Sequence, residues 1–324
     1  MPSAIHWEKN IGRRFQLRDL QVFFSVAEQR SMAKAAAELG VTQPSISAAI
    51  GGLETSLGAR LFERSPRGVE LTPIGQALLA RGRAAFDELR QGIRDIEFLN
   101  EHGVGEVTIG CPESIASGFL PATLDLLSRT NPRISVSVVH VVTPTVEFHE
   151  LDERRVDLVL ALLAVPDPHR VPAQYAVETL FEERLCIVVG RHSPLASRRR
   201  INFDELSQQP WVLGPLNTPG VSWIVEMFRA AGAEFPKRRI TTWSVHLRNH
   251  MAATGRFVAI TPESAFDRAA DRYGLKKLPI VFRAPRWPVA AVTLRKRKLS
   301  PVVDLFMDCA RSVARGYTNR QNSR

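Results

Sequence analysis

Three short helical patterns follow one another closely near the start of the chain, and their spacing restricts the folds it can adopt. Apolar residues recur every three or four positions at about 18–29, 31–39 and 42–57, which is the period of helices that pack on one side. Ser31 and Thr42 stand where helix N-caps are expected. The second and third helices are joined by about four residues, which predicts a helix-turn-helix.

The third of these helices has an unusual outer face. Its apolar stripe is predicted to face the core and consists of Ile46, Ala49, Ile50, Leu53 and Leu57. The positions turned away carry small side chains, namely Pro44, Ser47, Ala48, Gly51, Gly52 and Thr55. Surface helices normally carry Lys, Glu and Arg there, and each glycine inside a helix costs about 1 kcal/mol relative to alanine. Small side chains let a helix approach base edges in the major groove, so we interpret this face as DNA-binding. The alternative is a compact bundle whose third helix simply packs.

The stretch "ARLFERSPRGVELTP" follows the third helix. Leu61-Phe62 and Val69/Leu71 read as two short strands around a Ser-Pro-Arg-Gly turn. This pattern predicts a β-hairpin wing beside the helix-turn-helix.

Residues 73–100 form one long helical pattern. Its apolar residues lie largely three and four positions apart and include Leu78, Phe86, Leu89, Ile93 and Ile96. A lone helix would leave this stripe in water, so it needs a partner, and the simplest one is the same helix of a second subunit. Such a pair would present two recognition helices to two DNA half-sites. The alternative is that the stripe packs against its own domain.

From residue 105 onward, β-rich and helical segments alternate. "GEVTIGCP", "RISVSVVHVV" and "VDLVLALL" read as strands separated by helices, and this order predicts parallel strands. A second set runs from "ERLCIVVG" to "RFVAIT". Two such lobes with helix N-termini facing a shared crevice would form a ligand cleft. The fold class expected is α/β with an N-terminal, helix-rich winged helix-turn-helix.

The motifs AA-LGVTQPSIS, I-x-x-LE, LGA-x-LFER and LTP-x-G occur in order and without gaps. They resemble the winged helix-turn-helix of LysR-type transcriptional regulators, and the later segments "VDLVLALL" and "TGRFVAITPES" resemble the effector domain of that family. The resemblance covers about 17–315. It implies a DNA-binding domain at 17–74, a linker and dimerisation helix at 75–102, and a two-lobed domain at 105–315, similar to periplasmic binding proteins. "HLRNHMAATGRF" resembles a subgroup that regulates sugar-uptake binding proteins.

The resemblance also implies the function and the partners. We expect a DNA-binding transcriptional regulator, switched by a small-molecule effector such as a sugar or carboxylate in the C-terminal cleft. The expected partners are double-stranded promoter DNA and further copies of the chain, as a homodimer or homotetramer. No cofactor or metal is expected. The chain has no run of about 18 apolar residues and no signal-peptide pattern, so we expect a cytoplasmic protein without a membrane segment.

The DNA-contacting residues are carried over from the family's motif. They are Lys34, Thr42, Gln43, Pro44, Ser45 and Ser47 on the helix-turn-helix, and Arg64 and Arg67 on the wing. Gln43, Pro44, Ser45 and Ser47 would face bases, and the two arginines would contact phosphates or the minor groove. Ala48 and Ala49 stand where many members carry a basic or amide side chain, which leaves the target sequence open.

Effector-contacting residues are expected where strands end and helices begin. The candidates are Glu113, Ser114, Ile115, Thr143, Leu163, Asn217, Thr218, His246, Thr261 and Pro262. Hydroxyls and free N–H groups at helix starts suit a small anion or a hydroxylated ligand. The alternative for each of these candidates is ordinary helix capping.

Several other patterns allow a different interpretation. The C-terminal segment could belong to an enzyme or a small-molecule-binding protein, although it carries no nucleophile-elbow, zincin, P-loop or Rossmann motif. Cys111 could be a thiol sensor or a buried structural cysteine. His246 and His250 share a helix face, but Arg248 between them disfavours a metal. "RKRK" at 295–298 could bind nucleic acid or be a solvated strand end. The formal net charge of +10 indicates an acidic partner.

Overall fold

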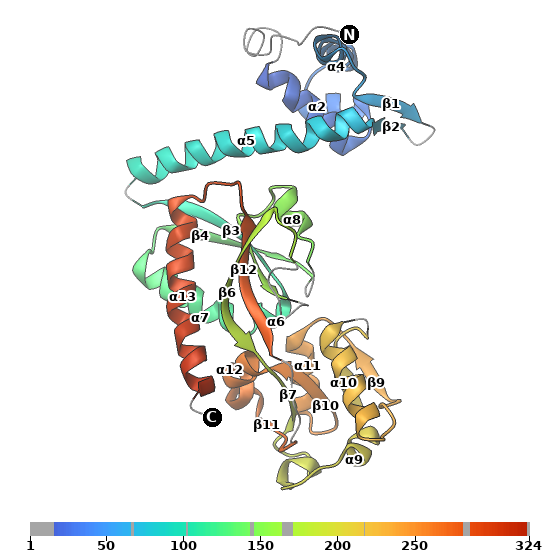
Figure 1. Ribbon diagram of the computed structural model, residues 1–324, viewed down its shortest axis with the longest axis vertical. Helices are drawn as coiled ribbons and strands as arrows, with labels where there is room; N and C mark the ends of the chain where they lie inside the picture. Colours follow the sequence, from blue (N-terminus) through green and yellow to red (C-terminus); the bar gives the residue numbers. More distant parts are fainter. Residues whose placement is uncertain are drawn as a thin grey trace. The chain divides into compact units, whose positions relative to one another are not determined.

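The computed structural model describes residues 16–65, 68–101, 103–142, 146–163, 171–216, 218–280 and 286–322. The chain divides into two compact units, 1–89 and 90–324. Helix α5 (Pro73–Asn100) continues across the boundary between them (Figure 1).

The first unit is a helix-turn-helix followed by a hairpin, as the sequence predicts. It contains α2 (Leu17–Gln29), α3 (Met32–Leu39) and α4 (Gln43–Leu57), then the antiparallel strands β1 (Phe62–Ser65) and β2 (Gly68–Leu71). The side chain of Ser31 accepts a hydrogen bond from Lys34 N at 3.3 Å, and that of Thr42 from Ser45 N at 3.3 Å. These bonds satisfy N–H groups that have no partner inside the helix, so they fix where α3 and α4 begin.

The inner stripe of α4 holds the first unit together. Ile46, Ile50 and Leu53 are buried at 0%, 3% and 1% exposure. They share one apolar core with Phe23, whose ring lies 5.2 Å from that of Phe62 at the start of the hairpin. Full burial of such a side chain stabilises a fold by about 1.5–3 kcal/mol. The core therefore fixes which face of α4 is left outward.

Helix α5 divides its apolar residues between two environments. Leu78 packs on the core of the first unit, and the Phe86 ring lies edge-on to Phe24 at 5.3 Å. These residues pack within the chain, which agrees with the alternative considered for the stripe. Further along the helix, large apolar side chains are exposed, from 49% to 73%: Leu89, Ile93, Ile96 and Leu99. The stripe that needs an external partner is thus confined to the last three turns.

The second unit consists of two lobes, each built on a five-stranded sheet. The sheet of lobe 1 has the order β4-β3-β5-β12-β6. Its strands are β3 (Gly105–Cys111), β4 (Ile134–His140), β5 (Leu158–Leu162), β6 (Tyr175–Glu183) and β12 (Trp287–Leu294). Strands β3, β4 and β5 are parallel, as predicted. Its core also takes in residues of α6 (Glu113–Ala116), α7 (Phe119–Thr130) and α13 (Pro301–Asn322).

The sheet of lobe 2 has the order β11-β7-β10-β8-β9. Its strands are β7 (Leu185–Gly190), β8 (Trp211–Leu213), β9 (Arg239–Thr241), β10 (Val258–Pro262) and β11 (Leu275–Lys277). The accompanying helices are α9 (Phe203–Ser207), α10 (Pro219–Ala230), α11 (Val245–Ala253) and α12 (Glu263–Tyr273), with a 3-10 turn η2 (Pro194–Ser197). Trp211 and Phe228 are fully buried at its centre.

The sequence reading did not anticipate the strands that close lobe 1. β6 and β12 pair antiparallel with each other, and β12 also pairs antiparallel with β5. The chain leaves lobe 1 at the end of β6 and re-enters it at the start of β12 (Figure 1). The segment "TVEFHELDERR" gives only a single turn, α8 (His149–Asp152).

Three of the four residues of the "RKRK" segment are exposed directly after β12, as expected of a solvated strand end, namely Arg295, Lys296 and Lys298, whereas Arg297 is buried. Arg297 is 6% exposed, and its Nη2 donates to Asp157 Oδ1 at 2.8 Å, while its Nη1 donates to Val156 O at 3.0 Å. Asp157 is 3% exposed and also accepts from Gln91 Nε2 at 3.2 Å. Among the described residues, no helix is long and apolar enough to cross a membrane.

Candidate DNA-binding face and effector cavity

The outward face of α4 is exposed, as its small side chains predict. Gln43, Pro44, Ser45 and Ser47 are all exposed, and so are Lys34 and Thr42 nearby. The hydroxyls of Thr42 and Ser45 lie 2.8 Å apart at the N-terminus of the helix. That end presents backbone N–H groups and the positive end of the helix dipole, a combination that favours a phosphate.

Gly51 and Gly52 face open space. No heavy atom of the described chain lies within 4 Å of the position that a Cβ would occupy at either residue. Packing within the chain therefore does not require glycine there. A groove of about 670 Å³ adjoins Gly51 and is lined by residues of α4 and the wing, among them Ser47, Glu54, Arg60 and Glu63.

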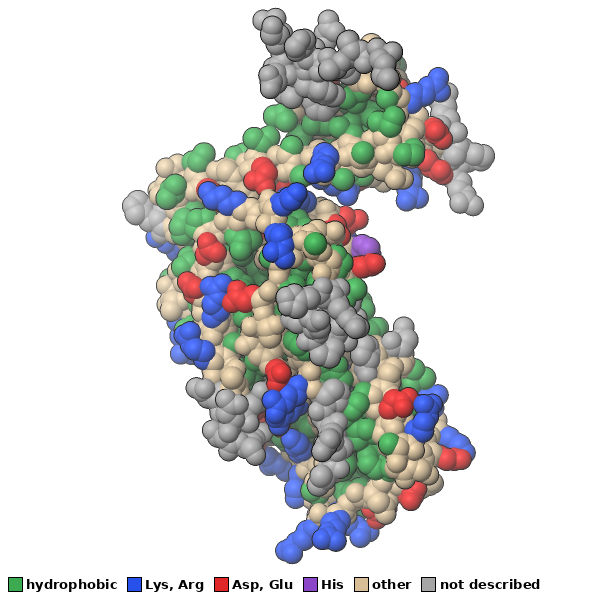
Figure 2. Space-filling view, in the orientation of Figure 1, with side chains coloured by type: hydrophobic (Ala, Val, Ile, Leu, Met, Phe, Trp, Pro, Cys, Tyr) green, Lys and Arg blue, Asp and Glu red, His purple; other side chains and the backbone are tan. Residues whose placement is uncertain are grey.

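The wing residues are described only in part. Register in the hairpin pairs Arg64 with Val69, and Arg67 lies outside the described residues. On the face seen in Figure 2, Lys and Arg side chains are spread over both units rather than gathered on the first. Any DNA contact by the first unit therefore depends on local placement rather than on bulk charge.

A cavity of about 90 Å³ lies between the two lobes of the second unit. Lobe 1 contributes Pro112, Glu113, Ser114, His140, Val141 and Leu162. Lobe 2 contributes Leu185, Gly214, Thr218, Gly220, Val221, Trp243, Arg248, Ile260 and Pro262. A cavity this large holds several waters or a small organic molecule.

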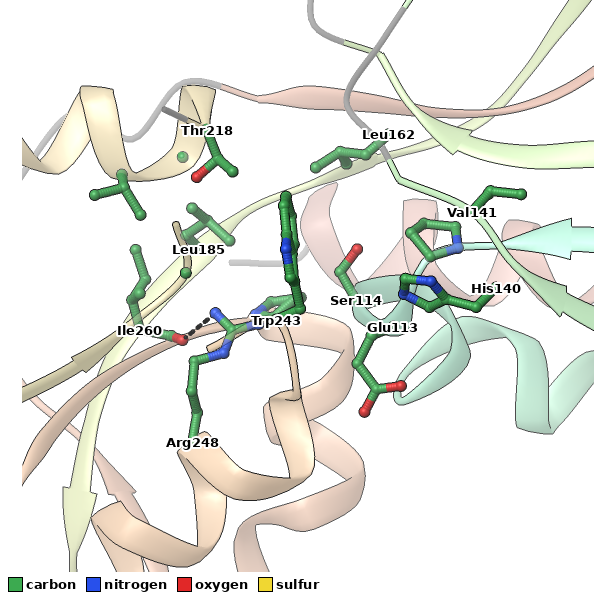
Figure 3. A pocket seen from close by; sticks show the side chains of 15 residues that line it. Glu113, Ser114, His140, Val141, Leu162, Leu185, Thr218, Trp243, Arg248 and Ile260 are labelled. Atoms are coloured by element: carbon green, nitrogen blue, oxygen red, sulfur yellow. Dashed lines mark hydrogen bonds between the residues drawn. The ribbon is translucent and has the colours of Figure 1, made fainter. Parts of the chain in front are cut away.

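The parallel strands of lobe 1 bring its residues together. Pro112 follows β3 directly, His140 ends β4 and Leu162 ends β5. The carboxyl ends of parallel strands meet at one edge of a sheet, where ligands of open α/β sheets usually bind. From lobe 2, Thr218 precedes α10, and Arg248 projects from α11 (Figure 3).

The structure brings four of the predicted effector residues to the cavity wall, namely Glu113, Ser114, Thr218 and Pro262. Ile115 and Leu163 are instead buried in the apolar cores of lobe 1. Thr261 is fully buried and absent from the wall, although its neighbours Ile260 and Pro262 line it. Successive side chains of a strand point to opposite faces, which explains why Thr261 faces away.

His246 lies outside the cavity wall as well. It is exposed, and its Nδ1 lies 2.6 Å from the Tyr273 hydroxyl. Thr143 and Asn217 fall outside the described residues. No group of three or more His, Cys, Asp or Glu side chains that could hold a metal occurs in the described parts of the chain.

The sequence did not lead us to expect Arg248, the charged residue that lobe 2 contributes to the cavity wall. Arg248 is 9% exposed, and its Nη1 donates to Ile260 O at 3.0 Å. Burial lowers the pKa of Arg248 to about 10, and the charge of Glu113 partly opposes that shift. The local signal was present, because Ser244 caps α11 through Leu247 N and helical spacing places Arg248 one turn in.

Cys111 is an inert structural residue rather than a reactive thiol. It is 1% exposed, and its Sγ donates to Pro112 O at 3.6 Å. Burial raises the pKa of the Cys111 thiol to about 12, and the nearby charge of Glu113 adds to the effect. Because the thiolate is the reactive form, this cysteine stays unreactive at neutral pH.

Two family models match this chain. Residues 17–76 match the bacterial regulatory helix-turn-helix protein of the lysR family, and residues 100–315 match the LysR substrate binding domain. Together they span the exposed helix face and the cavity.

Curated relatives and solved structures agree with the family models. The chain is 30% identical to the HTH-type transcriptional regulator PcaQ of Agrobacterium fabrum, over 94% of this chain and 96% of the relative. It is 29% identical to the transcriptional dual regulator GltC of Bacillus subtilis, over 90% and 95%. Among solved structures, CbnR complexed with its target DNA matches with a TM-score of 0.63 at 22% identity, covering 92% of this chain and all of that one.

Proposed function

We propose, since this chain belongs to the lysR family of bacterial regulatory proteins, that the outer face of α4 binds promoter DNA and that the cavity between the lobes binds the effector. The protein is a DNA-binding transcriptional regulator with an effector-binding domain. The observation that carries the assignment of α4 is its exposed, short-side-chain face, on which two glycines meet no atom of the chain.

Roles on the DNA-binding face follow from position and chemistry. Gln43, Ser45 and Ser47 would contact base edges, because they are exposed on the first two turns of a helix that can enter the major groove. Pro44 would face the bases beside them without a hydrogen bond. Lys34 and Thr42 would contact phosphates, and Arg64 and Arg67 would contact phosphates or the minor groove. Ala48 and Ala49 offer no polar group, so sequence reading would depend on the hydroxyls and on Gln43.

The proposed domains are a winged helix-turn-helix at 17–74, a linker helix at 75–102 and an effector domain at 105–315. The exposed apolar residues of α5, from Leu89 to Leu99, would pair with those of a second copy. A two-fold dimer requires an interrupted palindrome in the DNA. Pairing of two dimers would give a tetramer on the same principle.

The effector would act by binding, without catalysis, in the cytoplasm where promoter DNA lies. Glu113, Ser114, Thr218, Arg248 and Pro262 are the proposed contacts. Because the cavity has one wall on each lobe, a ligand can favour one lobe arrangement over another. It shifts that equilibrium only by the difference in its affinity for the two states.

A mobility-shift assay with the DNA upstream of the protein's own gene tests this function. We expect a specific complex whose affinity falls steeply with salt, because lysine and arginine contacts release counterions from DNA. A scrambled duplex of equal length is the control and should bind more weakly. Absence of any complex at low salt, together with turnover of a metabolite, would favour an enzyme.

A further inference from the structure

Arg248 is a buried cation without a carboxylate partner in the described chain. Its side chain is 9% exposed and lines the cavity (Figure 3). Nη1 donates to Ile260 O, but Nε has no acceptor among the described residues. The guanidinium is planar, presents its donors in a fixed fork and matches a carboxylate well.

The unpaired state of Arg248 is unfavourable without a ligand. Moving an ion out of water is costly unless an opposite charge or hydrogen bonds replace the lost solvation. Burial lowers the pKa of Arg248 to about 10, which still leaves the side chain charged at neutral pH. An anion in the cavity would supply both the opposite charge and the missing acceptor.

Glu113 adds a second requirement at the same cavity. It begins α6 in lobe 1, whereas Arg248 belongs to α11 in lobe 2 (Figure 3). The negative charge of Glu113 raises the pKa of Arg248, yet the two side chains form no ion pair in the described structure. An ionised carboxylate only accepts hydrogen bonds, so the ligand must offer a donor near Glu113 or suffer repulsion.

The rest of the wall is mostly apolar, and its other polar side chains are Ser114, His140 and Thr218. Eight of its fifteen residues have apolar side chains: Pro112, Val141, Leu162, Leu185, Val221, Trp243, Ile260 and Pro262. The Thr218 hydroxyl already donates to Pro215 O at 2.8 Å, which leaves it as an acceptor toward the cavity. With about 90 Å³ available, the body of the ligand is a short hydrocarbon.

We propose that the effector is a small carboxylate that also carries a hydroxyl or ammonium group, with its carboxylate on Arg248 and its donor group on Glu113. This proposal rests on the proposed function, which makes the cavity the effector site. A neutral sugar would not neutralise Arg248. A dicarboxylate would place a second negative charge against Glu113.

Calorimetric titration of the full chain with matched three-carbon probes tests the proposal. The probes are propanoate, L-lactate, L-alanine, malonate and propane-1,2-diol, with D-glucose as a neutral sugar. We expect L-lactate or L-alanine to bind about 10-fold tighter than propanoate, and propane-1,2-diol, D-glucose and malonate to bind more weakly than propanoate. Which of L-lactate and L-alanine binds tighter identifies the donor as hydroxyl or ammonium.

Substitutions then assign the two ends of the ligand. In Arg248→Met, we expect the carboxylates to lose about 10- to 100-fold in affinity. In Glu113→Gln, the advantage of L-lactate and L-alanine over propanoate should shrink, while propanoate binding persists. Arg199→Met, an exposed arginine of the same lobe, is the control and should bind like the natural protein.

Arg248→Lys is a second variant that tests the same contact if Arg248→Met does not fold. It retains the charge but loses the planar fork, so the carboxylates should bind about 10-fold more weakly. The proposal is overturned if no carboxylate binds the natural protein more tightly than propane-1,2-diol, or if that preference survives in Arg248→Met or Arg248→Lys.

The same samples separate this failure from failure of the proposed function. Mobility shifts with the upstream DNA are measured on the natural protein in the calorimetry buffer. An intact shift with no carboxylate preference rejects the ligand class and leaves the regulator. No shift even at low salt rejects the proposed DNA-binding face, whatever the cavity binds.

Discussion

Arg297 and Arg248 are two buried arginines of the second unit, and their surroundings are opposite. Arg297 is 6% exposed and donates to the carboxylate of Asp157 at 2.8 Å. Arg248 is 9% exposed, and no carboxylate of the described chain forms an ion pair with its guanidinium, whereas that of Arg297 is paired with Asp157. The difference teaches that a buried charge matched inside the chain is structural, whereas an unmatched one marks a place for a ligand.

The contacts of Asp157 show how a buried negative charge is compensated by residues of the same chain. Asp157 accepts hydrogen bonds from Gln91 of α5, from Thr108 N of β3 and from Arg297 after β12. Arg94 lies 3.6 Å from the same carboxylate. One carboxylate thereby links the end of the linker helix to the sheet of lobe 1. Its negative charge is compensated by the two arginines of the same cluster.

The glycines also differ in whether residues of the same chain account for them. A Cβ at Gly118 would clash with Ser264 Oγ and lie 2.8 Å from Ala265 N, so packing inside the chain requires glycine there. At Gly51 and Gly52 a Cβ would meet nothing within 4 Å of the described chain. Packing inside the chain therefore does not explain these two glycines, which agrees with the proposal that this face of α4 approaches DNA.

The largest effect expected is the difference between the same substitution at the two arginines. Arg297→Met leaves Asp157 buried with weaker compensation, and we expect the free energy of unfolding to fall by about 3–5 kcal/mol. Arg248→Met removes a charge that has no carboxylate partner in the described chain. We expect the free energy of unfolding of this variant to stay unchanged or to rise. Urea denaturation of both variants without ligand measures the difference. An equal fall in the free energy of unfolding in both variants would contradict the distinction between the two arginines.

A third buried charge, Glu183, predicts a pH dependence. It is 4% exposed at the end of β6, and it accepts hydrogen bonds from the Ser264 hydroxyl and from Ser264 N at 3.2 Å. Burial raises the pKa of Glu183 from 4.5 to about 7, and the bonds from Ser264 oppose the shift. Between these pH values the folded state keeps a proton that the unfolded state has lost.

The contribution of Glu183 to the free energy of unfolding should therefore be fully present below pH 4.5 and be lost as the pH rises through 7, a change of about 3 kcal/mol from this group alone. Glu183→Gln removes that contribution. Urea denaturation of both proteins across pH 5–8 isolates it, because all other carboxyls are shared. Parallel pH profiles would show that Glu183 titrates normally.

The smallest effect expected concerns the two glycines of α4. Gly51→Ala and Gly52→Ala should each raise the free energy of unfolding by about 1 kcal/mol, since alanine favours a helix and meets no clash. Gly118→Ala, the matched control, should lower it. If the glycines permit close approach to DNA, the two stabilised variants should bind DNA more weakly. Gains in both stability and DNA affinity would contradict that role.

The sequence was sufficient to predict which face of α4 is exposed, the face proposed to bind DNA, because that face is contiguous. Every residue of the α4 pattern lies within one helix, and the 3.6-residue period separates Ile46 and Ile50 from Ser47 and Gly51. The caps at Ser31 and Thr42 are local too.

The wall of the proposed effector cavity could be predicted only in part, because its residues come from separate segments. Glu113 and Thr218 were found at helix starts, where local signals are strong. Leu185 and Ile260 reach the cavity through the pairing of β7 and β10, which no local pattern encodes. The burial of Arg297 within "RKRK" was not predicted for the same reason, since its partner Asp157 is 140 residues away.

Anisotropy titration of labelled upstream DNA with Ser47→Glu and Gln21→Glu tests the central claim most directly. Both substitutions add one negative charge at an exposed helix position, the first on the outer face of α4 and the second on α2. We predict that Ser47→Glu weakens DNA binding by about 100-fold or more, because a carboxylate would enter the groove beside the phosphates. Gln21→Glu should stay within about 3-fold of the natural protein, since it adds the same charge outside the proposed contacts. Equal affinities for the two variants would contradict the account.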